Sequence, residues 1–187
     1  MPKSFDDIVG RPESQSFEWK RSLSLQREGL ESLCGMINAD GAYGSVLFGK
    51  APDGQIIGVE PGNLDRAQQS ISQTTRNKFE PAVQCTYEVL ERDGLSVMVV
   101  SAMRNRTVPY HEFDGRAFIR EGTVTRQLNL AEKQALQRQR NRDLHGGPWK
   151  CDGCGLFVGT LSAIVITDQG PRKTYSCRCG GEFWPAG

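Results

Sequence analysis

The chain has 187 residues, of which 37% are hydrophobic and 24% charged, and a formal net charge of +1. This length fits one domain of usual size with a small appendage, and the composition is that of a globular protein, neither fibrous nor disordered. The sequence has no apolar run near the roughly 20 residues that span a bilayer, and its first residues lack the pattern of an export signal. We therefore expect a cytoplasmic protein with no membrane partner.

In the first half of the chain, apolar residues recur with strand and helix periods in turn. Phe17 and Trp19 alternate with polar neighbours, which is typical of a strand. A helical apolar period follows, although Gly29 and Gly35 lower its helix propensity. The patterns predict, in order, a strand over 16–20, a helix over 25–38, a hairpin of 44–49 with 56–59, and a polar helix over 65–79.

The second half of the chain begins with a hairpin signal at Asp93-Gly94, between apolar runs over 83–91 and 95–103. A short strand over 116–120 follows, and then a helix to about residue 144 that opens with a capping box of Asn129 and Glu132. This order predicts an α/β or α+β domain over 1–145, with a mixed sheet flanked by helices. Residues 146–187 would form a second, smaller domain.

Four of the six cysteines lie near the end of the chain, as Cys151-x2-Cys154 and Cys177-x-Cys179. In a reducing compartment, clustered pairs of this kind indicate metal ligands before disulfides. We expect a zinc ribbon, in which four thiolates hold a structural Zn²⁺ and stabilise a module too small to fold by itself. The second pair has one intervening residue where two are usual, so His145 is an alternative ligand.

Basic residues are concentrated before this ribbon. Residues 115–150 contain eight Lys or Arg and three Asp or Glu, a local excess of 8 − 3 = 5 positive charges. Such an excess suits a surface that holds phosphates, and the alternative is a solvated helix with spare arginines.

Two glutamates and a lysine lie close together near the N-terminus, as Glu13-x4-Glu18-x-Lys20. Glu18 and Lys20 share one face of the predicted strand, and Glu13 precedes it and can fold back beside them. Adjacent carboxylates persist when a cation neutralises them, and hard oxygen ligands favour Mg²⁺ or Mn²⁺. The alternative is an exposed acidic strand.

Several weak motifs occur in a fixed order from Glu13 to Glu132 and together resemble the Schlafen AlbA_2 domain. They are the Glu-x4-Glu-x-Lys element and the segments Ile37-Asn-Ala, 41–49, 52–58, Glu80-Pro and 117–123. The resemblance implies an AlbA_2 fold, a nucleic-acid-binding domain and, in active members, a metal-dependent endoribonuclease that cuts tRNA or similar structured RNA with three carboxylates.

The resemblance also implies roles for individual residues. Glu13 and Glu18 match two of the three carboxylates, and Asp53 is the only acid in the turn that carries the third. Lys20 matches the family lysine and would steady the nucleophile or the charge on phosphorus. Lys50 stands where many members carry acids, so the third metal ligand depends on Asp53 alone. Because Schlafen cores have two lobes and this chain has one, a homodimer is expected.

The sequence thus predicts a metal-dependent endoribonuclease in which basic residues hold the RNA backbone. Double-helical RNA is recognised mainly through its phosphates and 2′-hydroxyls, which suits arginine side chains. The arginines expected to contact it are Arg116, Arg120, Arg126, Arg138, Arg140 and Arg142. One alternative is a regulator or accessory module that binds DNA or RNA without cutting it, and another is a protein-interaction domain whose ribbon docks a partner.

Overall fold

The computed structural model describes residues 4–105, 108–145, 149–151, 160–167, 170–176 and 183–185, and the side chains as far as Arg140. The chain divides into two compact units, 1–136 and 137–187, so the division falls inside the last helix. The first unit contains the elements α1 (Phe5–Val9), β1 (Phe17–Lys20), the 3-10 helix η1 (Leu23–Leu25), α2 (Gln26–Asn38), β2 (Tyr43–Phe48), η2 (Pro61–Asn63), α3 (Leu64–Lys78), β3 (Phe79–Glu80), β4 (Cys85–Arg92), β5 (Leu95–Met103), β6 (Glu112–Phe113), β7 (Arg116–Glu121) and β8 (Val124–Gln127). The last helix, α4 (Leu130–His145), begins in this unit.

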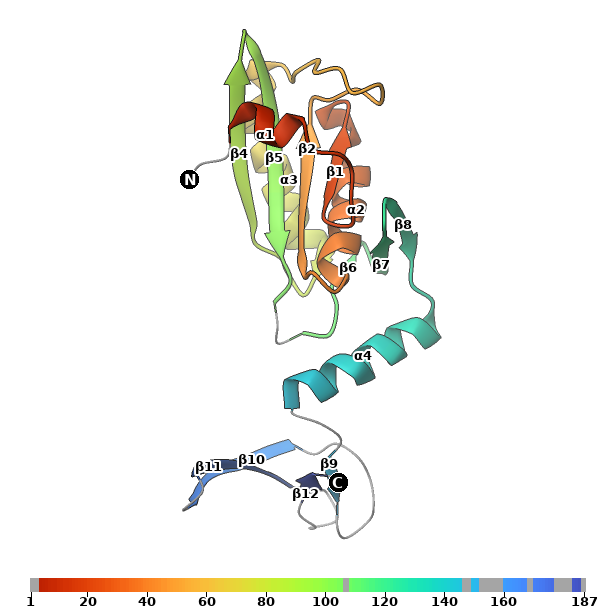
Figure 1. Ribbon diagram of the computed structural model, residues 1–187, viewed down its shortest axis with the longest axis vertical. Helices are drawn as coiled ribbons and strands as arrows, with labels where there is room; N and C mark the ends of the chain where they lie inside the picture. The colour runs from red at the N-terminus through yellow and green to blue at the C-terminus, as the bar shows by residue number, and fades with distance from the viewer. Residues whose placement is uncertain are drawn as a thin grey trace. The chain divides into compact units, whose positions relative to one another are not determined.

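The main sheet has the strand order β1-β2-β5-β4, with β1 parallel to β2 and the other neighbours antiparallel. α1 lies over one face, and α2 and α3 lie over the other (Figure 1). Side chains alternate between the two faces, so the sheet separates two cores. Ile8 and Val9 of α1 pack with Leu47 on one side, and Leu33 and Ile71 pack with neighbours on the other.

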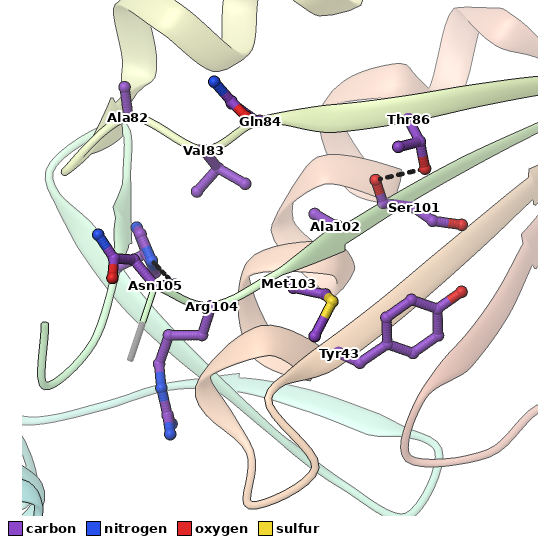
Figure 2. A pocket seen from close by; sticks show the side chains of 11 residues that line it. Tyr43, Ala82, Val83, Gln84, Thr86, Ser101, Ala102, Met103, Arg104 and Asn105 are labelled. Carbon is purple, nitrogen blue, oxygen red and sulfur yellow. Dashed lines mark hydrogen bonds between the residues drawn. The ribbon is translucent and has the colours of Figure 1, made fainter. Parts of the chain in front are cut away.

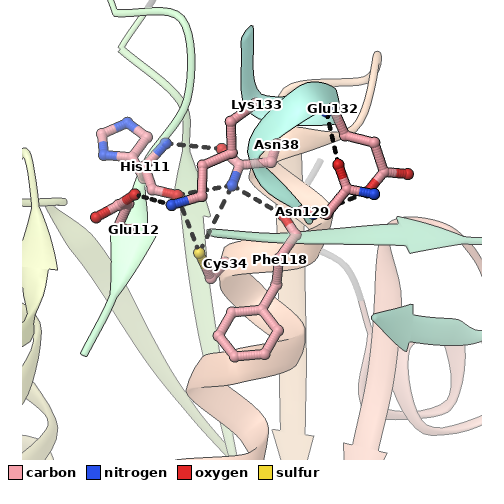
Figure 3. Close-up of polar contacts among 8 residues, drawn as sticks. All are labelled: Cys34, Asn38, His111, Glu112, Phe118, Asn129, Glu132 and Lys133. Atoms are coloured by element: carbon pink, nitrogen blue, oxygen red, sulfur yellow. Dashed lines mark hydrogen bonds and ion pairs between the residues drawn. The ribbon is translucent and has the colours of Figure 1, made fainter. Parts of the chain in front are cut away.

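A second sheet, ordered β3-β6-β7-β8, packs against the far side of α2. Asn38, the last residue of α2, connects these elements, because its side chain is fully buried and needs partners. Its amide donates to the carbonyl oxygens of His111 at 2.8 Å and Phe118 at 2.9 Å and accepts from the His111 N–H at 2.8 Å (Figure 3). One side chain therefore ties the end of α2 to the second sheet.

The two helix-weakening glycines of α2 are explained by close packing. A Cβ atom on Gly35 would lie 3.2 Å from the backbone nitrogen of Arg120 in β7, and one on Gly29 would lie 2.8 Å from the Phe48 ring. The helix therefore gives up propensity to let two sheets approach it closely.

The predicted α+β class is confirmed, as are both long hairpin strands and the helices over α2, α3 and α4. The capping box also forms, with Asn129 N–H donating to Glu132 at 2.8 Å and the Glu132 N–H donating back at 3.0 Å. The predicted single sheet is instead two, and the short helix α1, with its own capping box of Ser4 and Asp7, was not expected.

The predicted hairpin of 44–49 with 56–59 is wrong. Both edges of β2 are already paired, with β1 and β5, so no edge is left for a hairpin partner. Residues 49–59 form a loop that makes isolated bridges only, from Lys50 to Ile56 and from Val59 to Ser96.

The second unit contains two antiparallel strand pairs: β9 (Trp149–Cys151) with β12 (Phe183–Pro185), and β10 (Thr160–Thr167) with β11 (Gly170–Ser176). No helix among the described residues is both long and apolar enough to cross a membrane.

Candidate functional site

The centre of the candidate site is Glu18 on β1. Because side chains alternate along a strand, Glu18 and Lys20 point away from the face on which Phe17 and Trp19 pack with α1. Glu18 is only 8% exposed, and its carboxylate accepts from the Lys20 ammonium at 2.6 Å. Its second oxygen pairs with the Arg120 guanidinium from β7. A nearly buried carboxylate is thus held between two cations.

Arg120 fixes the lead-in to β1 as well as Glu18. Its Nε donates to the Ser14 carbonyl at 2.8 Å, and its Nη1 donates to the Thr125 hydroxyl at 3.0 Å. Its Nη2 has no hydrogen-bond partner among the described residues. The side chain is 1% exposed, which differs from the expectation that Arg120 lies along an open RNA-binding surface. A guanidinium enclosed in this way supports the site from inside the protein.

Glu13 does fold back onto β1, as the sequence predicted, and its carboxylate accepts from the Trp19 N–H at 3.3 Å. Its electrostatic neighbour is Lys50. Burial lowers the pKa of the Lys50 ammonium below its ordinary value, and the Glu13 charge offsets part of this shift. The Lys50 ammonium donates to the Val9 carbonyl at 2.7 Å and lies 3.8 Å from the centre of the Trp19 ring. Trp19 and Glu18 point to opposite faces of β1, so Lys50 is a cation on the α1 side of the sheet.

The sequence pattern does not indicate a role for Lys50. The only signal was its position in the segment where the family often carries acids. In the structure Lys50 is 6% exposed and connects the end of α1 with the loop after β2.

Asp53 lies in an exposed turn, and its Oδ1 accepts from the Gln55 N–H at 3.0 Å, as an ordinary turn residue does. In the part of the chain that the structure describes, no three His, Cys, Asp or Glu side chains are arranged to hold a metal ion. Glu13, Glu18 and Asp53 are all in that part. Glu18 already pairs with two side-chain cations and Asp53 lies in an exposed turn, so a shared Mg²⁺ or Mn²⁺ site and the catalytic role of the three carboxylates stay predictions.

The basic residues expected on the RNA surface differ from one another in the structure. Arg116 is exposed at the start of β7. Arg126 pairs with Glu121 at 2.7 Å and Glu132 at 2.8 Å, and these two carboxylates raise the pKa of its guanidinium. Arg126 can contact a phosphate only by exchanging these partners, so Arg116 is the more available of the two.

Other predicted residues lie in the second unit. Arg138 and Arg140 are on the part of α4 that belongs to this unit. The Arg142 side chain and the zinc ligand set lie outside the described residues, apart from the backbone of Cys151 in β9. The positions outside are those of Cys154, Cys177 and Cys179. Zinc binding therefore stays a prediction.

The first unit also has a pocket of about 620 Å³ where β4 begins and β5 ends. Figure 2 shows Tyr43, Thr86 and Met103 around it. The Ser45 hydroxyl joins those of Tyr43, at 2.7 Å, and Ser101, at 2.8 Å, in a chain across β2 and β5.

Comparisons with known proteins found two similar solved structures and one matching family model. The chain is similar to the DIP2311 protein from Corynebacterium diphtheriae, with 15% identity and a TM-score of 0.50 over 87% of this chain and 30% of that one. It is also similar to the N-terminal domain of a RecG-related protein from Nitrosomonas europaea, with 20% identity and a TM-score of 0.47 over 67% of this chain and 90% of that one. No curated protein sequence matches it. The model of the family described as Schlafen, AlbA_2 matches residues 13–129, which include every strand of both sheets of the first unit and more than half of the chain. The chain therefore belongs to the Schlafen AlbA_2 family.

Proposed function

We propose that this protein binds nucleic acid through its first unit. The observation that carries this proposal is the family match over residues 13–129, because Schlafen core domains are nucleic-acid binders. The RecG-related protein in the comparison is named after a DNA helicase, which is consistent with a role on nucleic acid.

The charge of the candidate site supports the same function. Two cations, Lys20 and Arg120, surround the single carboxylate of Glu18, so the cluster carries a net positive charge. Lys20 is partly exposed, and Arg21, the next residue, is exposed. A positive cluster of this kind raises the local concentration of phosphates.

The test is binding of fluorescently labelled tRNA, duplex RNA and duplex DNA, measured by anisotropy at several salt concentrations. Arg116→Gln should weaken binding and lower the slope of log Kd against log salt by about 1, because each phosphate contact releases about one counterion. Arg92→Gln is the matched control, since it removes the same charge from an arginine that pairs with Asp6. Absence of binding to all three ligands at low salt would refute the proposal.

The second candidate is metal-dependent endoribonuclease activity on tRNA or similar structured RNA. The nearly buried Glu18 carboxylate beside Lys20 favours it, because the resemblance to the Schlafen AlbA_2 domain implies a metal-binding carboxylate and a lysine at these two positions. The turn position of Asp53 counts against it.

Incubation of the protein with tRNA and Mn²⁺ or Mg²⁺ distinguishes the two candidates. Cleavage that is lost with EDTA and in Glu18→Gln, but kept in the exposed Glu88→Gln control, would support the enzyme. The Asp53→Asn variant then tests whether the turn carboxylate takes part. Intact tRNA in every lane, together with binding, would support a module that holds nucleic acid without cutting it.

Two further properties belong to this proposal. The ribbon would hold one structural Zn²⁺ per chain, as four thiolates with no open position do. The chain would also form a homodimer, which supplies the second lobe of the Schlafen core, and light scattering of the eluted protein would test this.

A further inference from the structure

The helix α3 is unusually polar for an element that packs on a sheet. Of its 15 residues, only Ile71 and Thr75 are buried. Gln69, Gln73 and Arg76 are exposed and follow the i, i+4, i+7 spacing, so they lie on one face of the helix. α3 therefore presents amides and a guanidinium along a continuous stripe.

This stripe borders a groove of about 540 Å³ between α3 and β4, which is an edge strand of the main sheet. The groove is lined by four amide side chains, Ser72, Arg76 and Tyr87. The Tyr87 hydroxyl interacts with Ser72 and Thr75 of α3, and its half-buried ring packs against the core. The ring is thus held in place as one wall of the groove.

The lining has a distinct chemistry. It carries one positive charge and no negative charge. Solvated helix faces ordinarily mix charges of both signs, as Arg27 and Glu31 do on α2. Arg76 forms no ion pair with any described residue, whereas Arg27, Arg120 and Arg126 each pair with a carboxylate. Four amides beside an unpaired arginine favour an anionic ligand that also offers hydrogen-bond donors and acceptors.

We propose that the groove between α3 and β4 binds unpaired nucleotides of an RNA or DNA strand, an inference that rests on the proposed function. Unpaired bases expose their Watson–Crick edges, which amides match because each carries both donors and an acceptor. Arg76 contacts a phosphate, and Tyr87 offers an aromatic surface for a base. A fully paired duplex hides these edges and binds the groove less well.

This groove is separate from the Glu18 cluster. β4 and β1 are the opposite edges of the main sheet, three strand spacings apart, or about 14 Å. A nucleic acid that reaches both sites therefore has a single-stranded segment next to the part held near Glu18, as at a loop or an end.

The test is anisotropy of an unstructured oligonucleotide of about 12 nucleotides, as RNA and as DNA, with a blunt hairpin duplex as the comparison ligand. Arg76→Ala should weaken binding of the single strands at least about fivefold and lower the salt slope by about 0.7, the value for one phosphate contact on a single strand. Arg66→Ala is the matched control, because Arg66 is an exposed arginine of the same helix that does not line the groove. It should change Kd by less than about twofold, within the scatter for a surface residue without contacts.

A second variant separates base contacts from charge. The Gln69→Ala/Gln73→Ala protein should bind single strands more weakly and discriminate less between homopolymers, with an unchanged salt slope, because it loses hydrogen bonds and no charge. Circular dichroism and thermal midpoints check that each variant is folded.

The outcomes are separable. The proposal that the groove binds unpaired nucleotides would be refuted if both groove variants bind single strands as the wild type does. It would also be refuted if Arg66→Ala and Arg76→Ala lose single-strand affinity equally. Either result leaves the proposed function standing. A wild-type protein that binds neither single strands nor duplexes would overturn the proposed function and the groove together.

Discussion

The buried pair of Glu18 and Arg120 makes a sharp prediction about stability. Glu18→Leu should lower the free energy of unfolding by about 3–5 kcal/mol, since it leaves the Arg120 charge buried without its carboxylate. Arg120 is 1% exposed, and its Nη2 has no hydrogen-bond partner within the part of the chain that the structure describes, so water has little access to replace the lost carboxylate. Arg120→Met should cost less, because Glu18 keeps the Lys20 ammonium at 2.6 Å.

The double variant Glu18→Leu/Arg120→Met should be more stable than Glu18→Leu alone, because it removes the buried Arg120 charge together with its carboxylate, and the Lys20 ammonium that also loses its partner is partly exposed to water. Urea unfolding followed by circular dichroism measures the free energies, and hydrogen exchange of β1 and β7 amides shows whether the change is local. Arg126→Met is the control: an exposed ion pair is worth about 0–1 kcal/mol. Additive single costs, or a Glu18→Leu cost below about 1 kcal/mol, would refute the reasoning.

Four other outcomes are expected. Two basic side chains, Lys78 and Arg27, lower the pKa of Asp114, so its contribution to stability is present near neutral pH and is lost as pH falls through that pKa. Asp114→Asn should lower the thermal midpoint at about pH 7, and this effect should shrink as the pH is lowered into the acid range. Gly44→Ala should destabilise by about 1–3 kcal/mol in urea unfolding, because the new Cβ would lie 2.5 Å from a neighbouring side-chain carbon, whereas Gly62→Ala, with nothing within 4 Å, should be nearly neutral. Burial raises the pKa of Cys34 to about 12, so an alkylating reagent should modify this thiol only after unfolding, which mass spectrometry detects. Elemental analysis should find one zinc per chain, and the Cys151→Ser variant should lose it.

Some contacts of the candidate site follow from the sequence pattern of β1, and others do not. The alternation in β1 placed Glu18 and Lys20 on one face, and both the pairing with Lys20 and the return of Glu13 to the strand agree with that prediction. The pattern contained no information about Arg120, because it comes from a strand about 100 residues later and its burial depends on how closely α2 approaches β7. The role of Lys50 was hidden for the same reason, since its partners are α1 and Trp19.

Local periodicity determined most of the elements by itself, including α2, α3, α4 and the hairpin of β4 and β5, because their hydrogen bonds are made between residues near in sequence. Which strands pair at a distance was decided by tertiary structure alone. β2 pairs with β1 and β5, so the local turn signal at 52–54 had no free edge to pair with and became a loop. The same competition for edges divided the strands into two sheets around α2, since a strand has only two edges and long-range packing determines which neighbours occupy them.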